Sequence, residues 1–175
     1  MRLHRRRQFL HLAVGAAALP SVSRIARAQT YPTRPIRLII PFPPGGSYNA
    51  IGRPWADRMK ALLGTVVVEN QGGASGTLGA AAVARAQPDG HTLLLAGSGQ
   101  LGVYKVMANR PTYDPIKDLR PITVAAVTCY AIAVHPSVPT HNLVELAAHA
   151  KTNPGKLSFG SAGVGGMNHL SGELF

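Results

Sequence analysis

The sequence predicts an α/β fold, because short apolar runs alternate with segments of helical periodicity. Three such runs, at 36–40, 66–68 and 91–96, are each followed by a loop that contains glycine and then by a helical segment. Of the 175 residues, 46% are hydrophobic and 14% are charged. This composition favours a globular protein with a sizeable core over a disordered segment, and the length suits one domain, or one and part of another.

The first 28 residues have the pattern of an export signal. A basic start at 1–7 precedes an apolar stretch at 9–19, and Ala26 and Ala28 place small residues where a signal peptidase reads the chain. We therefore predict a signal peptide at 1–28, cleaved near Ala28, and a mature protein in the periplasm. The alternative is an amphipathic N-terminal helix of a cytosolic protein.

The export route stays open between the general and the twin-arginine pathways. Arg6 and Arg7 begin the run RRQFL, which resembles the twin-arginine motif, but Arg5 stands where that motif usually has Ser or Thr. The apolar stretch is too short to span a bilayer permanently, and no cysteine directly follows it for a lipid anchor. We expect no stable membrane anchor.

The net charge of +11 is concentrated at the N-terminus, where six of the 18 basic residues lie within the first 28 positions. The remaining sequence carries a formal charge of +5, with scattered basic residues and few aromatic ones. This pattern does not predict a nucleic-acid-binding patch.

The stretch 38–53, LIIPFPPGGSYNAIGR, joins a predicted strand to a predicted helix. Prolines cannot continue a central strand, and Gly45 and Gly46 let a ligand approach the main chain. Ser47 or Asn49 can cap the helix, whose unpaired N–H groups favour an anion. The loop is therefore either a carboxylate- or phosphate-binding loop or an ordinary strand-to-helix connection.

Periodicity predicts a helix at 49–63 and another at 78–86. Pro54 suits the first turn of the earlier helix, and Gly64 suits its end. The expected buried side chains of this helix are Ile51, Trp55, Met59, Leu62 and Leu63.

The segment 97–102 matches the dinucleotide-binding pattern G-x-G-x-x-G. It follows the third predicted strand rather than the first, Pro111 interrupts the next segment, and no strand ending in an acid follows at the distance that a ribose contact needs. Nucleotide binding is thus a weak alternative. A hydrolase is equally weak, because Ser98 and Ser161 lack the G-x-S-x-G context.

The apolar run 122–136 predicts a strand long enough to cross between domains, with Cys129 as a buried, inert thiol. A helix is expected at 142–151, capped by Asn142 or Thr140, and a further strand at 156–160. The expected buried side chains of the helix at 142–151 are Leu143, Leu146, Ala147 and Ala150.

A second glycine-rich loop at 161–170 repeats the layout of the first, with Asn49 and Asn168 near the two helix starts. Two such helix N-termini facing each other across a cleft would hold a dicarboxylate from both ends. The histidines show no metal-ligand spacing. We expect no catalytic residue, metal site or cofactor.

The sequence resembles the periplasmic substrate-binding proteins of tripartite tricarboxylate transporters, the Bug or TctC family. The motifs follow family order and spacing from Tyr31 to Phe175. They are Tyr31-Pro32, Pro35-Ile36, 41–46, 67–70, 79–84, 88–94, 113–118, 153–157, 161–163, His169-Leu170 and Gly172-Glu173.

This resemblance implies a two-lobed α/β fold of the periplasmic-binding-protein type, a Venus flytrap, with lobe 1 at 29–125 and the start of lobe 2 at 126–175. Since family members are close to twice as long, we expect the second lobe to be truncated. The implied function is capture of a small carboxylate for integral membrane transporter subunits, by a monomer. A sensor that feeds a signalling system is the alternative.

The resemblance also implies a ligand-binding set drawn from three loops. Its members are Phe42, Pro44, Gly45, Gly46, Ser47, Tyr48, Asn49, Ser98, Gly99, Ser161, Gly163 and His169. Tyr48 and Asn49 depart from the family pattern, which has Thr and then Asp. We therefore expect a ligand that differs from acidic amino acids.

Overall fold

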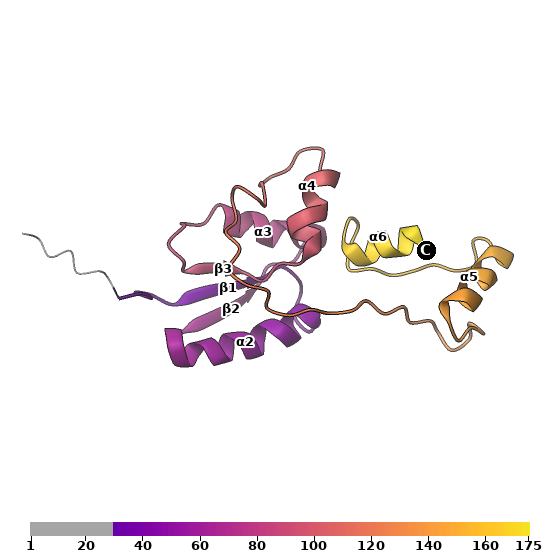
Figure 1. Cartoon of the computed structure of the whole chain (residues 1–175), viewed down its shortest axis with the longest axis horizontal. Helices are drawn as coiled ribbons and strands as arrows, with labels where there is room; N and C mark the ends of the chain where they lie inside the picture. Colours follow the sequence, from indigo (N-terminus) through magenta and orange to yellow (C-terminus); the bar gives the residue numbers. More distant parts are fainter. Residues whose placement is uncertain (1–29) are drawn as a thin grey trace, which may run out of the picture. The chain divides into compact units, whose positions relative to one another are not determined.

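A three-stranded parallel sheet, in the order β2-β1-β3, organises the computed structural model, which describes residues 30–175 (Figure 1). The central strand β1 (Ile36–Ile40) places Leu38 opposite Val68 of β2 (Val66–Asn70) and Leu93 of β3 (Thr92–Leu94). All apolar residues of β1 are at most 1% exposed, as expected for a parallel strand covered on both faces. The three predicted strands of this region are confirmed.

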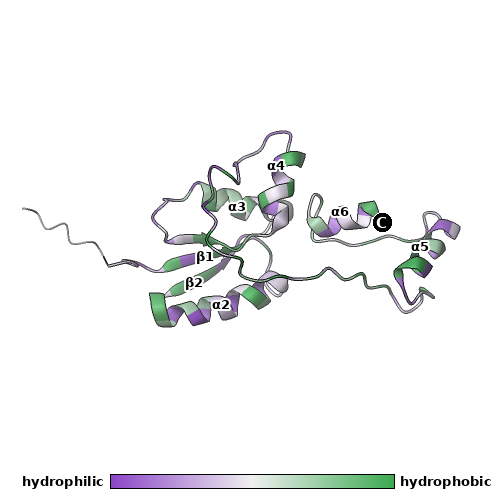
Figure 2. Cartoon of the chain, viewed as in Figure 1, coloured by the Kyte–Doolittle hydropathy of each residue, from purple (hydrophilic) through white to green (hydrophobic). Residues whose placement is uncertain are grey.

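The helix α2 (Ser47–Leu63) packs against one face of the sheet, and α3 (Thr77–Ala84) lies on the other (Figure 1). Trp55, Met59 and Leu63 of α2 cover a cluster that includes Ile36 and Leu38. Polar and apolar residues alternate along α2 (Figure 2). Leu62, in contrast with the prediction, is 85% exposed.

The start of α2 differs from the prediction. The helix begins two residues earlier than predicted, so Pro54 lies in its interior rather than in its first turn. Its N-cap is Gly46, without a side-chain hydrogen bond, so neither Ser47 nor Asn49 caps it. Asn49 is instead turned inward by other hydrogen bonds, whereas Gly64 ends the helix as predicted.

After β3 the chain forms a π-helical stretch, η3 (Gly99–Val103), that continues into the short helix α4 (Tyr104–Met107). The G-x-G-x-x-G segment is therefore largely helical, and its Gln100 is only 2% exposed. The dinucleotide pattern instead needs a glycine loop that leads from the first strand into a long helix.

The predicted strands at 122–136 and 156–160 do not form among the described residues. A strand needs a neighbouring strand to satisfy its N–H and C=O groups. Neither segment has such a neighbour among the described residues, 30–175. Ile122, Val124 and Val127 are each more than 70% exposed. For the same reason Cys129 is exposed, which corrects the prediction of a buried thiol.

Helix α5 (Leu143–Thr152) is capped by Asn142, whose Oδ1 accepts a hydrogen bond from the Glu145 N–H at 2.9 Å. The Glu145 carboxylate reaches back to the His141 N–H, which lowers the pKa of Glu145. Of the predicted buried face only Leu146 is buried. The last helix, α6 (Met167–Leu174), follows the second glycine-rich loop as predicted.

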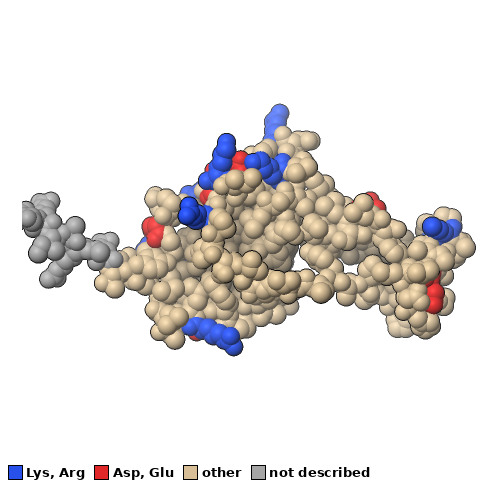
Figure 3. All heavy atoms as spheres, in the orientation of Figure 1, with Lys and Arg blue, Asp and Glu red and all other residues tan. Residues whose placement is uncertain are grey.

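Ion pairs connect several charged residues, among them Arg37–Glu69 across β1 and β2 and Lys105–Asp114. On the face drawn in Figure 3, basic side chains lie in separate groups, some beside acidic ones. Within residues 30–175, no helix has the length and apolar character needed to cross a membrane. The predicted signal peptide lies outside the described residues, and the lobe boundary at 125 stays a prediction.

Candidate functional site

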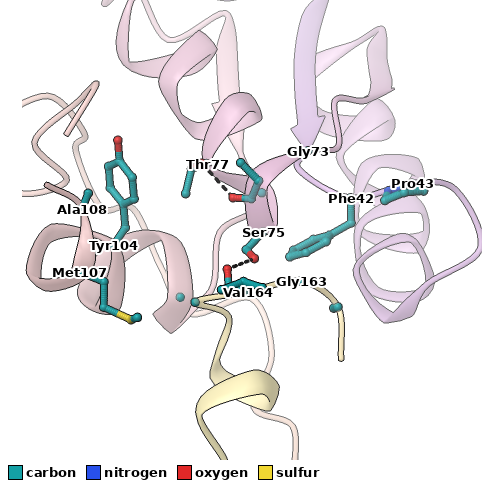
Figure 4. Close-up of a pocket in the computed structure, with 15 residues that line it drawn as sticks. Phe42, Pro43, Gly73, Ser75, Thr77, Tyr104, Met107, Ala108, Gly163 and Val164 are labelled. Atoms are coloured by element: carbon teal, nitrogen blue, oxygen red, sulfur yellow. Dashed lines mark hydrogen bonds between the residues drawn. The ribbon is translucent and has the colours of Figure 1, made fainter. Parts of the chain in front are cut away.

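A cleft of about 640 Å³ is lined by residues from the loops that follow the three parallel strands. Figure 4 shows the side chains that line it. Each strand contributes the loop that follows it, and the second glycine-rich loop forms a further wall. The carboxyl edge of a parallel sheet is where open α/β folds place their ligand sites. The lining residues are Phe42, Pro43, Gly73, Ala74, Ser75, Gly76, Thr77, Gly99, Tyr104, Met107, Ala108, Ala162, Gly163, Val164 and Gly165.

Two asparagine side chains hydrogen-bond to main-chain carbonyls of the loop after β1. Asn70 donates from Nδ2 to the Phe42 carbonyl at 2.7 Å, and Asn49 donates from Nδ2 to the Pro43 carbonyl at 3.1 Å. Arg53 donates to both amide oxygens, at 3.2 Å to Asn49 and 3.5 Å to Asn70. Since arginine only donates, it fixes which end of each amide faces the loop.

Of the predicted residues in this first loop, Phe42 lines the cleft and the others do not. Asn49 is buried beneath the loop, at 5% exposure. Tyr48 packs against the Phe42 ring, with centroids 4.5 Å apart. Burial, with a smaller effect of Tyr130, raises the pKa of Tyr48. The remaining predicted residues are exposed outside the lining and are Pro44, Gly45, Gly46 and Ser47.

The loop after β2 supplies five lining residues, and sequence reasoning missed all of them. Ala74 and Ser75 have left-handed backbones, with φ of 47° and 54°, which is uncommon for residues other than glycine. The Ser75 hydroxyl donates to the Val164 carbonyl at 2.6 Å. The available signal was the run GGASG directly after a strand, at the same edge as the Pro-Pro-Gly-Gly loop.

The loop after β3 contributes Gly99 to the lining, while Ser98 is exposed and lies outside it. The buried Gln100 accepts from the Gly97 N–H through Oε1 and donates through Nε2 to the Ser75 carbonyl, at 2.9 and 2.5 Å. The Tyr113 hydroxyl donates to the Gln100 carbonyl at 2.7 Å. Burial, with a smaller effect of Tyr104, raises the pKa of Tyr113 to about 12, so this donor keeps its proton at neutral pH.

The second glycine-rich loop brings Gly163 into the lining but leaves Ser161 and His169 outside it. Gly163 has a φ of 127°, and a Cβ there would lie 2.6 Å from the Ser75 Oγ. Glycine therefore allows the two loops to meet. His169 lies on α6 beside Phe159 and Glu173, and its Nδ1 has no hydrogen-bond partner within the described part of the chain.

The helix start that lines the cleft belongs to α3, through Gly76 and Thr77, rather than to α2. The start of α6 lies nearby, because Gly166 is the nearest neighbour of an added Cβ on Gly99, at 3.9 Å. The prediction that the starts of α2 and α6 face each other across the cleft is therefore not met within residues 30–175, because the start of α3 takes the place of the start of α2 in the lining. The hydroxyl groups of Ser75 and Thr77 already donate to the Val164 and Ala74 carbonyls, at 2.6 and 2.8 Å, so the donors that the cleft can offer a ligand are main-chain N–H groups at the start of α3.

Charged side chains are absent from the lining within residues 30–175. Phe42, Tyr104 and Met107 provide apolar walls, while Ser75 and Thr77 provide hydroxyl groups (Figure 4). Within the same residues, no group of three or more His, Cys, Asp or Glu side chains could hold a metal ion. The cleft is suited to reversible binding of a small molecule by hydrogen bonds and apolar contact.

The sequence profile of the tripartite tricarboxylate transporter family receptor, TctC, matches residues 51–175. The chain belongs to the TctC family. Curated relatives of this family member are 34–40% identical over 85–95% of the chain. The chain spans about half the length of these relatives.

Three solved structures resemble this TctC-family chain, each over about half of its own length or less. The periplasmic binding protein BugD is 34% identical with a TM-score of 0.68, over 82% of the chain and 48% of BugD. Rpa4515 of R. palustris with adipate is 30% identical with a TM-score of 0.73, over 82% of the chain and 48% of Rpa4515. MatC of Rhodopseudomonas palustris with bound malate is 30% identical with a TM-score of 0.61, over 70% of the chain and 42% of MatC.

These likenesses confirm the predicted family and the periplasmic-binding-protein fold, of which the chain covers a part. Proteins of this family and their structural neighbours are solute-binding proteins rather than enzymes, as predicted.

Proposed function

We propose that the chain is an extracytoplasmic solute-binding protein that captures a small carboxylate for a tripartite tricarboxylate-type transporter. The observation that carries this proposal is the uncharged cleft at the carboxyl edge of the sheet. Main-chain N–H groups near a helix start can bind a carboxylate without a lysine or arginine, and the start of α3 lines this cleft. Adipate and malate, bound by two structural neighbours, are both carboxylates.

The ligand we propose is a carboxylate with an apolar body rather than an acidic amino acid. The apolar faces of Phe42, Tyr104 and Met107 suit a hydrocarbon chain or an aromatic ring. An ammonium group would be desolvated without an acidic partner among the described lining residues, which is costly. The prediction that the ligand differs from aspartate and glutamate therefore gains a physical reason.

A thermal-shift panel on the full chain tests the proposal. Adipate, benzoate, malate, citrate, aspartate and glutamate are compared at equal ionic strength, with adipamide as the uncharged control. A ligand at 100 times its Kd adds about 2.7 kcal/mol to the unfolding free energy, so we expect Tm to rise by about 5 °C or more for adipate or benzoate. No shift with any carboxylate, or preference for aspartate or glutamate, contradicts the proposal.

The transport role needs a separate test in cells. Deleting the gene should abolish uptake of the carboxylate that gives the largest shift, and restoring it should recover uptake. Normal uptake together with loss of a transcriptional response to the same carboxylate would instead favour the sensor alternative.

A further inference from the structure

We propose that Ser75 is a positioning residue that fixes the second glycine-rich loop against the cleft. Its hydroxyl bridges two chain segments that lie 89 positions apart in sequence. Both segments line the cleft, so the bridge sets the distance between two of its walls (Figure 4). The effect on affinity rests on the proposed function, whereas the effect on loop order does not.

The backbone of Ser75 indicates that its position is imposed by its surroundings. The left-handed conformation, with φ of 54° and ψ of 32°, is unfavourable for a residue with a Cβ, and Ala74 also has a positive φ, of 47°. Such conformations persist where neighbouring contacts over-determine them. The next residue, Gly76, is buried so closely that an added Cβ would lie 2.7 Å from the Gln100 Nε2 and 3.0 Å from the Pro41 carbonyl oxygen.

Gln100 provides the contact that holds Ser75 in place. Its Nε2 donates to the Ser75 carbonyl at 2.5 Å, while its Oε1 is occupied by the Gly97 N–H. The Gln100 main-chain carbonyl accepts from Tyr113, which is 4% exposed. A buried amide with both ends satisfied cannot turn without losing a hydrogen bond, so the carbonyl of Ser75 is fixed, while its hydroxyl donates to the Val164 carbonyl.

The partner segment is shaped to accept this hydroxyl. Gly163 approaches Ser75 so closely that a Cβ would collide with its Oγ, and Gly166 donates to the Gly163 carbonyl at 3.2 Å. The turn 163–166 therefore presents the Val164 carbonyl directly to Ser75.

Three variants of the full chain test the proposal: Ser75→Ala, Ser75→Gly and, as a matched control, Ser137→Ala. Ser75→Ala removes the hydroxyl and keeps the Cβ. Ser75→Gly removes the hydroxyl and relieves the backbone conformation. Ser137→Ala removes a hydroxyl that contacts His135 in a turn outside the lining.

The first measurement is hydrogen exchange of the peptide 161–170 without ligand. We expect exchange to become about fivefold faster in both Ser75 variants and unchanged in Ser137→Ala, because one neutral hydrogen bond is lost. Ser75→Gly should retain or raise Tm, which separates loss of the bridge from loss of folding. Unchanged exchange in both Ser75 variants overturns the proposal.

The second measurement is affinity and dissociation rate for the carboxylate that binds the wild-type chain. We expect Kd to rise about fivefold in both Ser75 variants, mainly through faster dissociation. If the wild-type chain binds no carboxylate, the proposed function fails while the exchange result still decides the role of Ser75. If Ser75→Gly binds as the wild-type chain does, the hydroxyl is dispensable for binding and the positioning role is wrong.

Discussion

Asn49 illustrates how one residue can influence the cleft without lining it. The sequence places it in the Pro-Pro-Gly-Gly loop region, and the family resemblance suggests a ligand contact. In the structure its amide lies beneath the loop, between the Pro43 carbonyl and Arg53. An amide makes both contacts because it donates at one end and accepts at the other, whereas the Asp of the family pattern only accepts and could not donate to the Pro43 carbonyl.

Asn49→Asp should therefore destabilise the fold. The new carboxylate oxygen would face the Pro43 carbonyl, 3.1 Å away in the present structure, without a proton between them. We expect a loss of about 1–2 kcal/mol at pH 7, since an unsatisfied buried acceptor is costly and a stronger contact with Arg53 offsets only part of it. Urea unfolding followed by circular dichroism measures the difference.

Asn168→Asp is the matched control for this substitution. Asn168 is exposed in the first turn of α6, where a negative charge is favourable, so we expect no loss of stability. Equal stability of Asn49→Asp and the wild-type chain would show that the amide does not support the loop.

Sequence reasoning at this scale identified glycine and asparagine positions but not their directions. Gly163 and Phe42 line the cleft, as a ligand-binding residue would, while Asn49 is buried and Tyr48 packs against the Phe42 ring. Residue type alone cannot distinguish these cases, because an amide satisfies a ligand and a buried carbonyl equally well. Ser75 was missed because its importance comes from contacts with Gln100 and Val164, far away in sequence.

At the scale of elements, α3 depends on glycine for its position against the sheet. A Cβ on Gly79 would lie 2.8 Å from the Gln71 carbonyl oxygen and 3.1 Å from the Pro41 Cα. Both are main-chain atoms at the ends of strands, so neither can move aside easily. Because α3 carries Thr77 at its start, this close packing also places part of the cleft wall.

Gly79→Ala should destabilise the chain although alanine is the better helix former. Overpacking costs about 1–3 kcal/mol, which exceeds the gain of about 1 kcal/mol in helix propensity. Gly102→Ala is the control, because a Cβ there meets nothing within 4 Å. We expect it to be neutral or slightly stabilising in thermal unfolding. A Gly79→Ala chain with an unchanged Tm would contradict the tight contact.

The strands that sequence reasoning predicted correctly are those whose pairing partners lie within residues 30–175. The first three strands and the helices between them follow from hydrophobic periodicity and glycine, as at Gly64. The runs at 122–136 and 156–160 have the same apolar character but no pairing partner within residues 30–175. Hydrophobic periodicity indicates that a segment is able to form a strand, whereas the strand forms only where a neighbouring strand pairs with it.

At the scale of the whole molecule, stability should be distributed unevenly. β1 is hydrogen-bonded on both sides, and its apolar side chains are at most 1% exposed. Residues 120–134 form no backbone hydrogen bond with other residues of the described range, 30–175, and Val127 is 89% exposed. Opening free energies range from near zero in such segments to the global value in central strands.

Hydrogen exchange of the full chain should therefore give its slowest amides in β1 and near-intrinsic rates at 120–134. The apolar side chains of the latter segment also make it the strongest candidate for contact between copies, so the measurement is repeated at 5 and 100 µM, chosen to span about a 20-fold range around typical micromolar association. A monomer, as the sequence predicts, gives the same rapid exchange at both concentrations.

Protection at 120–134 that rises with concentration would mean that this segment forms its strand with another copy, because an apolar run without a partner gains both hydrogen bonds and burial by pairing. Protection independent of concentration would place its partner within the same chain.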